Sequence, residues 1–218
     1  LVRRIIADKN LKYTDSVPEF SRTLGEELLE PTRLYTGVLN RVLADPRFDG
    51  QISALSHITG GGIAANLSRI LPDRVGLDVD RSTWAPNPVF RVLADWGGYE
   101  LNDLESTWNL GLGFAAVVRS SVAHELIAFM NDAGVPSWQL GVIESTPCDS
   151  ELPGYVTEAK GVRGGAVRLV SSYALSGRCV GRACRSVWDK RCIHNRDCCW
   201  LFECPGFTDQ RDPSPLLF

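Results

Sequence analysis

Apolar residues recur three and four positions apart in several stretches of the chain, which is the spacing of an amphipathic helix. This spacing predicts helices over residues 1–9, 34–43, 63–71, 89–96 and 122–133. A further short helix is predicted from a capping box, Thr23-Leu-Gly-Glu26, and is expected to stop at Pro31. The pattern over 122–133 ends at Gly134, a residue type that often adopts the left-handed conformation just after a helix.

Alternating or continuous apolar runs lie between these helices and predict strands over residues 52–58, 75–79, 114–118, 138–143 and 166–170. Because strands and helices alternate, we expect an α/β fold, a layered α+β sandwich in which helices cover a mixed sheet, over residues 23–174. Residues 1–22 precede it as a helix and a polar connector. From residue 175 onwards the apolar periodicity is lost.

The composition is that of a soluble globular protein. The chain has 218 residues, of which 44% are hydrophobic and 22% charged, and its net charge is −3. This balance gives no reason to expect a nucleic-acid partner. No run approaches the ~20 apolar residues of a membrane span, and no signal peptide is evident, so we expect a cytoplasmic protein. The chain begins at Leu1 and its single methionine is Met130, so we expect a fragment.

Three consecutive glycines, Gly60, Gly61 and Gly62, stand between a predicted strand and a predicted helix. That order leaves bare backbone N–H groups at a helix N-terminus, where the helix dipole also favours an anion. Thr59 can add a hydroxyl donor and can cap the helix. The functional interpretation is a phosphate-binding loop, and the alternative is a tight turn in which the glycines serve geometry alone. No lysine follows as it would in a Walker loop.

Other candidate residues flank these glycines. Gly111 and Gly113 match a dinucleotide fingerprint on paper, but a strand follows them, so we expect a turn that brings backbone near a ligand. His57 is either a ligand donor and acid–base group or a structural histidine. Arg33 could pair with a phosphate or form a surface salt bridge. Asn109 is either a ligand contact or a turn residue.

Four motifs follow one another along the chain. They are "LGEELLEPTRLY" (24–35), "HITGGGIAANLSRILP" (57–72), "DRSTWAPNPVFRVL" (80–93) and "STWNLGLGF" (106–114). In this order they resemble those of phosphoribosylformylglycinamidine cyclo-ligase, the aminoimidazole ribonucleotide synthetase of purine biosynthesis. The resemblance covers about residues 1–147, and 161–173 is similar to the family's C-terminal end.

The resemblance implies an ATP- and Mg²⁺-dependent ring closure of formylglycinamidine ribonucleotide to 5-aminoimidazole ribonucleotide. In that family an N-terminal domain dimerises and supplies most of the ATP site, so a full-length homodimer is implied. Residues 1–22 would end that missing domain and residues 23–174 would be the C-terminal domain. We therefore expect no cyclisation by this chain alone. The substrate or phosphate site implied by the motifs consists of Thr59, Gly60, Gly61 and Gly62, with His57, Asn66, Thr32, Arg33, Asn109, Gly111 and Gly113 nearby.

Two alternatives to this function stay open. One is another ATP-using enzyme of the same architecture, such as formylglycinamidine synthetase, selenophosphate synthetase or thiamine-phosphate kinase. The other is a non-catalytic module that binds a phosphoribosyl ligand. The sequence contains no nucleophile constellation that would identify catalytic residues, and no metal-spaced cluster precedes residue 175.

The last segment, residues 175–218, differs in composition from the rest. Six of the seven cysteines lie between Cys179 and Cys204. Three disulfides do not suit a cytosolic enzyme, and the spacings lack the paired CxxC of common zinc sites. We expect this tail to be unstructured or foreign to the family, with a zinc site as the alternative.

Overall fold

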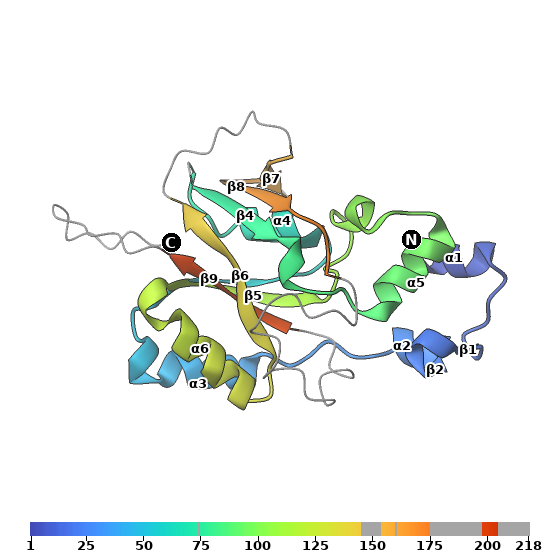
Figure 1. Cartoon of the computed structure of the whole chain (residues 1–218), viewed down its shortest axis with the longest axis horizontal. Helices are drawn as coiled ribbons and strands as arrows, with labels where there is room; N and C mark the ends of the chain where they lie inside the picture. The colour runs from blue at the N-terminus through green and yellow to red at the C-terminus, as the bar shows by residue number, and fades with distance from the viewer. Residues whose placement is uncertain (74, 145–153, 160, 175–197, 205–218) are drawn as a thin grey trace.

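The computed structural model describes residues 1–73, 75–144, 154–159 and 161–174, together with the backbone of 198–204 (Figure 1). The helices are α1 (Val2–Asp8), α2 (Leu24–Leu28), α3 (Thr36–Ala44), α4 (Gly62–Ser68), α5 (Pro88–Gly97) and α6 (Ser120–Asp132). The main strands are β3 (Ile52–His57), β4 (Gly76–Asp80), β5 (Leu112–Arg119), β6 (Ser137–Glu144), β7 (Val156–Ala159), β8 (Val162–Val170) and β9 (Cys198–Cys204). Two short strands, β1 (Ser16–Val17) and β2 (Arg22–Thr23), and four 3-10 turns complete the elements, namely η1 (Pro18–Phe20), η2 (Pro46–Phe48), η3 (Arg81–Thr83) and η4 (Leu101–Leu104).

The main sheet is mixed, in the order β3-β5-β9-β6-β4-β8-β7. The pairs β3–β5, β4–β6 and β7–β8 are antiparallel, whereas β4–β8 and both pairs made by β9 are parallel. Mixed pairing with helices in the connections is the layered α/β arrangement that the alternating pattern predicted, so the predicted fold class is confirmed.

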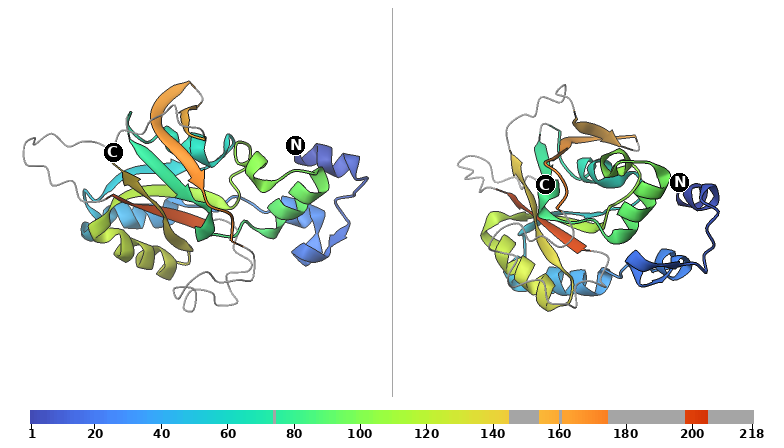
Figure 2. Two further views of the ribbon diagram at one scale, coloured as in Figure 1. Left: turned by 45° about the horizontal axis from the view of Figure 1, so that its top comes forward. Right: turned by 45° about the vertical axis from the view of Figure 1, so that its right-hand side comes forward.

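Helices cover both faces of this sheet (Figure 2). On one face α3 and α6 share an apolar cluster with β5, to which Ala116 and Val118 contribute. On the other face α4 packs through Ile63 and Leu67, and there Ala115 and Val117 of β5 belong to the cluster. Strand β5 is therefore buried on both sides, which explains its continuous apolar run.

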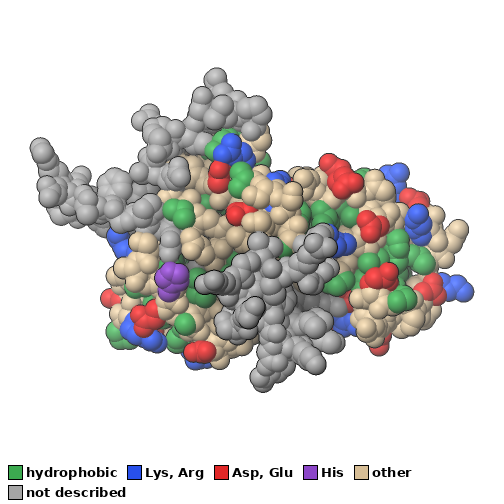
Figure 3. Space-filling view, viewed as in Figure 1, with side chains coloured by type: hydrophobic (Ala, Val, Ile, Leu, Met, Phe, Trp, Pro, Cys, Tyr) green, Lys and Arg blue, Asp and Glu red, His purple; other side chains and the backbone are tan. Residues whose placement is uncertain are grey.

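The N-terminal elements gather around α5, at the right-hand end of Figure 1. Their apolar cluster consists of Ile6, Val17, Phe20, Leu24 and Val92. Acidic and basic side chains are interspersed over the surface of this end, as expected where a small cluster meets solvent (Figure 3). Residues 1–22 thus pack onto the α/β domain, and their assignment to the end of an upstream domain stays a prediction.

The expected helices and strands all occur, with small shifts in their ends. The stripe predicted from residue 34 is narrower than expected. Helix α3 begins at Thr36, and Leu34 and Leu43 are 87% and 56% exposed, so only Val38 and Val42 of that stripe are buried. The capping box at Thr23 is present as predicted, with the Thr23 hydroxyl accepting from the Glu26 N–H.

The sequence did not predict the short strands β1, β2 and β7, nor strand β9 in the cysteine-rich tail. In β9 the run Cys198-Cys-Trp-Leu-Phe is continuously apolar, as is typical of a strand between two parallel neighbours. In the sequence alone, its cysteines are instead interpreted as possible disulfide or zinc-binding residues. The remainder of the tail, 175–197 and 205–218, lies outside the described residues. Its assignment as unstructured or foreign stays a prediction.

Glycine at residue 164 lets β8 pass directly beneath α4. A Cβ at Gly164 would overlap the backbone carbonyl of Ser68, and the Ser68 hydroxyl donates to Gly165 O over 2.7 Å. Replacing Gly164→Ala is therefore expected to lower the free energy of unfolding by about 3 kcal/mol through overpacking. The control Gly37→Ala lies on α3, where a Cβ meets nothing within 4 Å, and should raise stability by ~0.5–1 kcal/mol. Urea denaturation of both variants measures the difference, and an equal effect would contradict this packing.

Candidate functional site

A pocket of about 290 Å³ opens where β3 ends and the glycine run begins. This is close to the lower end of small-molecule sites, which start near ~300 Å³. The predicted site residues that line it come from three separated segments of the chain. They are Thr32, His57, Thr59, Gly60, Asn109 and Gly113.

The pocket is lined by both polar and aromatic side chains. Thr32, His57, Thr59 and Asn109 supply polar groups, and Phe90 and Trp108 supply aromatic rings with centroids 5.8 Å apart and planes tilted by 49°. Phe90, Thr107 and Trp108 lie within the quoted motifs, but no feature of the sequence marked them as site residues. Such a pocket suits a ligand with one charged or hydroxylated end and one flat, less polar part.

The three glycines are not equivalent, because backbone geometry calls for glycine at Gly61 and Gly62 but not at Gly60. Gly61 and Gly62 have φ values of 101° and 77°, which side chains rarely adopt. A Cβ at Gly62 would also overlap the backbone carbonyl of Glu105. Gly60 has neither constraint, since a Cβ there meets nothing within 4 Å, and it lines the pocket. Turn geometry therefore accounts for Gly61 and Gly62, and only Gly60 is left open toward a ligand.

The helix N-terminus offers fewer donors than the sequence suggested. The Gly62 N–H donates to Thr59 O over 3.3 Å, and the Ile63 N–H donates to Glu105 O over 3.3 Å. These two groups start α4 and were expected to be bare. They are engaged because the loop folds back on itself and against the segment before β5.

The free donors lie just before the helix instead. Among the hydrogen bonds of the described residues, none uses the N–H of Thr59, Gly60 or Gly61 as donor. The expectation that Thr59 caps the helix is wrong: the N-cap is Gly61, with no side-chain cap bond. The Thr59 hydroxyl is thus not used as a cap. Two of the three residues with an unused backbone N–H, Thr59 and Gly60, line the pocket, and successive backbone donors of this kind suit an anionic oxygen.

The buried side chain of Asn66 holds the glycine loop by hydrogen bonds to two of its backbone carbonyls. It is 2% exposed, and its amide Nδ2 donates to Thr59 O over 3.1 Å and to Gly62 O over 2.6 Å. Ser56 in turn donates from its hydroxyl to Asn66 O over 3.1 Å. Asn66 was expected near the ligand, but the structure places it behind the loop, where it fixes the loop's shape.

Two further predicted residues do not line the pocket. The Arg33 guanidinium donates to Gly134 O over 3.1 Å, which directs it to the end of α6. Gly111 has a φ of 94° and donates its N–H to Asn109 Oδ1 over 3.2 Å. The expected turn into a buried strand at Gly111 and Gly113 is confirmed, and Gly113 lines the pocket.

His57 is exposed and its ring is held by two aromatic neighbours. It stacks on Phe114 with centroids 6.0 Å apart, and it meets the Tyr35 ring edge-on at 5.8 Å. The imidazole therefore keeps a defined orientation at the pocket without being buried. A histidine in this position can donate a hydrogen bond to a ligand or exchange a proton with it.

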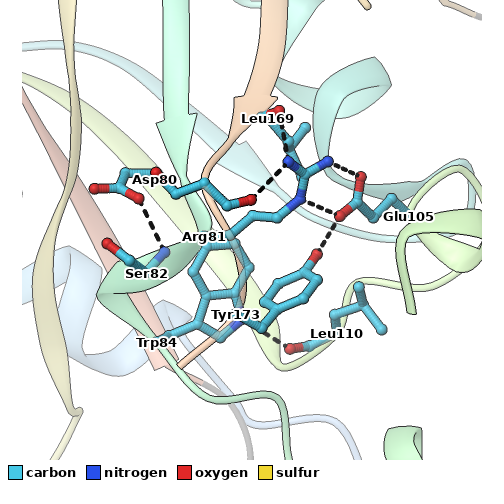
Figure 4. A network of polar contacts seen from close by, with 9 residues as sticks. Asp80, Arg81, Ser82, Trp84, Glu105, Leu110, Leu169 and Tyr173 are labelled. Carbon is cyan, nitrogen blue, oxygen red and sulfur yellow. Dashed lines mark hydrogen bonds and ion pairs between the residues drawn. The ribbon is translucent and has the colours of Figure 1, made fainter. Parts of the chain in front are cut away.

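A network of polar contacts lies beside the glycine loop (Figure 4). Arg81 pairs with Glu105 through both carboxylate oxygens, and the Tyr173 hydroxyl donates to the same carboxylate. Hydrogen bonds to Glu105 raise the pKa of Arg81 although burial opposes this. Burial, followed by the contact with Glu105, raises the pKa of the Tyr173 phenol, so this group stays a donor. The motif containing Arg81 was recognised in the sequence, but its pairing with Glu105 was not.

Within the described residues, no three His, Cys, Asp or Glu side chains gather in a way that could hold a metal ion. No helix in that same part of the chain is both long and apolar enough to cross a membrane.

The different roles of two glycines predict different outcomes. Gly62→Ala is expected to lower the free energy of unfolding by about 3 kcal/mol or to prevent folding, because the new Cβ meets Glu105 backbone and φ is positive. Gly60→Ala should change stability by less than about 1 kcal/mol, since its surroundings are open. Thermal and urea denaturation measure both, and a well-folded Gly62→Ala variant would refute the close approach.

The charge of Asp80 stabilises the turn that contains Arg81, and this stabilisation depends on pH. Burial acts to raise the pKa of Asp80, but hydrogen bonds from the Ser82 N–H, over 2.9 Å, and from the Ser82 and Ser171 hydroxyls outweigh it and hold the pKa below 3.8. Since the folded state favours the charged form, this stabilisation is present above pH 3.8 and is lost as the pH falls through the lowered pKa.

The Asp80→Ala variant is accordingly expected to be about 1 kcal/mol less stable than the unchanged chain at pH 7. That difference should shrink as the pH is lowered below 3.8. Urea denaturation of both proteins at a series of pH values gives the difference directly. A difference independent of pH would show that the charge of Asp80 is not involved.

Comparison with known proteins agrees with this fold. Residues 1–150 match the family described as AIR synthase related protein, C-terminal domain. A putative phosphoribosylformylglycinamidine cyclo-ligase of Streptomyces fradiae is 46% identical over 144 residues, which is 66% of this chain and 77% of that protein. A bifunctional purine biosynthetic protein of Pichia angusta is 36% identical over 155 residues, 71% of this chain and 19% of that protein.

A phosphoribosylformylglycinamidine cyclo-ligase of Acetivibrio thermocellus is 33% identical over 145 residues, 66% of this chain. The matched part is 42% of that enzyme, so the chain spans about two fifths of this bacterial relative's length. The resemblance to the C-terminal portion of the cyclo-ligase, expected from the motifs, is confirmed. Because the match to the family extends over residues 1–150, more than half of the sequence, this chain belongs to the AIR synthase related proteins and carries their C-terminal domain.

Proposed function

We propose that this chain is the substrate-binding part of a phosphoribosylformylglycinamidine cyclo-ligase. The reaction would be the ATP-dependent closure of formylglycinamidine ribonucleotide to 5-aminoimidazole ribonucleotide in purine biosynthesis. The family match and the names of the relatives support this assignment. The single observation that carries it is the run of backbone N–H groups at Thr59, Gly60 and Gly61 that donate to nothing among the described residues. Thr59 and Gly60 of this run line a pocket that Phe90 and Trp108 also line.

The proposed binding mode follows from the polar and the aromatic residues that line the pocket. The phosphate of the ribonucleotide would lie at the glycine loop, where backbone N–H groups and the Thr59 hydroxyl donate to its oxygens. His57 and Asn109 would donate to the phosphate or the ribose. Phe90 and Trp108 would lie against the flat amidine and amide part and exclude water from it. Such a site accelerates a ring closure by holding the reacting groups together.

When bound, ATP with Mg²⁺ would supply the phosphoryl group that activates the formyl oxygen. The described residues of this chain suit a phosphate but do not offer a cluster of acidic side chains for the metal ion. We therefore place most of the ATP and Mg²⁺ site on an N-terminal domain that lies outside this chain. We further propose that the full-length enzyme is a cytoplasmic homodimer and that this chain alone binds substrate without turning it over.

Isothermal titration calorimetry of the 218-residue chain with ribose 5-phosphate tests the site. We expect saturable binding at one site, competed by inorganic phosphate. Thr59→Ala should raise the Kd about tenfold, because it removes a donor to a charged oxygen. Gly60→Ala should raise it similarly by narrowing the rim.

Arg33→Ala is the matched control, because Arg33 is a nearby cation whose guanidinium is directed to Gly134 O. It should leave the Kd unchanged. Equal affinity of Thr59→Ala and the unchanged chain, or a large loss in Arg33→Ala, would refute the proposed loop. Detectable cyclisation by this chain alone would refute the proposed division of labour between domains.

A further inference from the structure

A buried ion pair stands behind the wall of the pocket. Arg81 Nε lies 2.5 Å from Glu105 Oε1 and Arg81 Nη2 lies 2.7 Å from Oε2, so the guanidinium and the carboxylate meet through two parallel bonds. Both side chains are only 13% exposed. Two charges are kept out of water in this way only when their geometry is good, and removing one leaves the other unpaired.

The backbone of Glu105 contacts the glycine loop, so the ion pair that holds the Glu105 side chain also affects the position of the loop. Its carbonyl oxygen accepts the Ile63 N–H and fills the space that a Cβ at Gly62 would occupy. Glu105 thus contacts Arg81 through its side-chain carboxylate and the start of α4 through its backbone carbonyl. A shift of Glu105 would move the loop that carries the free donors.

The segment 105–110, which forms one wall of the pocket, is held at its other end as well. The Trp84 indole N–H donates to Leu110 O over 3.1 Å, and the Trp84 and Tyr173 rings meet edge-on at 5.0 Å (Figure 4). Arg81 and Trp84, which hold the two ends of this segment, belong to one turn at residues 81–84. Between its two held ends lie the three pocket residues Thr107, Trp108 and Asn109.

Arg81 is itself fixed to the sheet. Its Nη1 donates to Leu169 O over 2.6 Å and to Ser171 O over 3.3 Å, at the end of β8. The guanidinium is therefore held by the end of β8 as well as by Glu105. The contacts form one continuous path from β8 through Arg81 and Glu105 to the glycine loop on one side and the pocket wall on the other.

We propose that Arg81 and Glu105 are positioning residues for the ligand pocket, setting the separation between the glycine loop and the wall at 107–109. This inference rests on the proposed function for the identity of the ligand, since it assumes that the pocket takes a phosphorylated sugar. Neither residue lines the pocket, so both act through the backbone groups that they hold.

The chain contains a second ion pair with similar partners, which serves as the control. Arg168 pairs with Asp78 through Nε at 3.0 Å and Nη2 at 2.5 Å, and the Tyr155 hydroxyl donates to Asp78 over 3.3 Å. Like Arg81, Glu105 and Tyr173, this triad consists of an arginine, a carboxylate and a tyrosine, and it joins β4 to β8. Its charged side chains are more exposed, at 34% for Arg168 and 42% for Asp78. Neither Arg168 nor Asp78 lines the pocket.

The experiment compares Arg81→Met, Arg81→Lys and Glu105→Gln with Arg168→Met in the 218-residue chain. The first readout is the Kd for ribose 5-phosphate, measured at a temperature where thermal denaturation shows each variant folded. Arg81→Met should raise the Kd about tenfold or more, while Arg168→Met should leave it within about twofold of the unchanged chain. Arg81→Lys should fall between, because an ammonium cannot bridge the carboxylate and Leu169 O as the planar guanidinium does. Glu105→Gln, which keeps the side chain's length, should also fall between.

The second readout needs no ligand. Amide hydrogen exchange should accelerate at Ile63 and over residues 107–110 in Arg81→Met and not in Arg168→Met. If the unchanged chain fails to bind ribose 5-phosphate but exchange accelerates as expected, the proposed function fails and the positioning role stands. If the unchanged chain binds and Arg81→Met shows the same Kd and the same exchange, the positioning role is refuted and the proposed function stands.

Discussion

The site depends on the close approach of two backbone segments, Gly62 and Glu105. A side chain at residue 62 would overlap the Glu105 carbonyl, and the Ile63 N–H donates to that same oxygen. This contact fixes how far the loop after β3 lies from the segment before β5, and the pocket is the space between them. It also uses up the donors at the start of α4, so the donors left for a ligand are those of the residues before the helix. The glycine run therefore has two roles: Gly62 allows the close approach to Glu105, and the residues before it keep backbone N–H groups available for a ligand.

Most of the fold could be predicted from the sequence because the periodic patterns are strong and local. Helix α6 and its terminal Gly134, the capping box at Thr23 and the doubly buried strand β5 follow from spacing alone. The exposed Leu34 and Leu43 show the limit of that reasoning, since an apolar stripe does not say which of its residues meet a neighbour. Strand β9 pairs with strands far away in sequence, and no local pattern reports such a partner.

The candidate site could be predicted only in part. The motifs located the loop at Thr59 and Gly60, but they could not say that Asn66 lies behind it or that Arg33 is directed elsewhere. The ion pair of Arg81 and Glu105 could not be predicted, because Arg81 lies in one motif and Glu105 lies outside all four, 24 positions away, with nothing in the sequence to mark the pairing. Which donors of a glycine loop are free is a property of three-dimensional packing and has no sequence signal.

The most direct test of this account is an NMR titration of the ¹⁵N-labelled chain with ribose 5-phosphate, following the backbone amides of the glycine loop. The account predicts large, saturable downfield shifts at Thr59, Gly60 and Gly61, whose N–H groups donate to nothing else among the described residues. It predicts much smaller shifts at Gly62 and Ile63, whose N–H groups are already engaged. Binding that shifts Gly62 and Ile63 while leaving Gly60 unchanged, or that shifts amides away from the pocket, would contradict it.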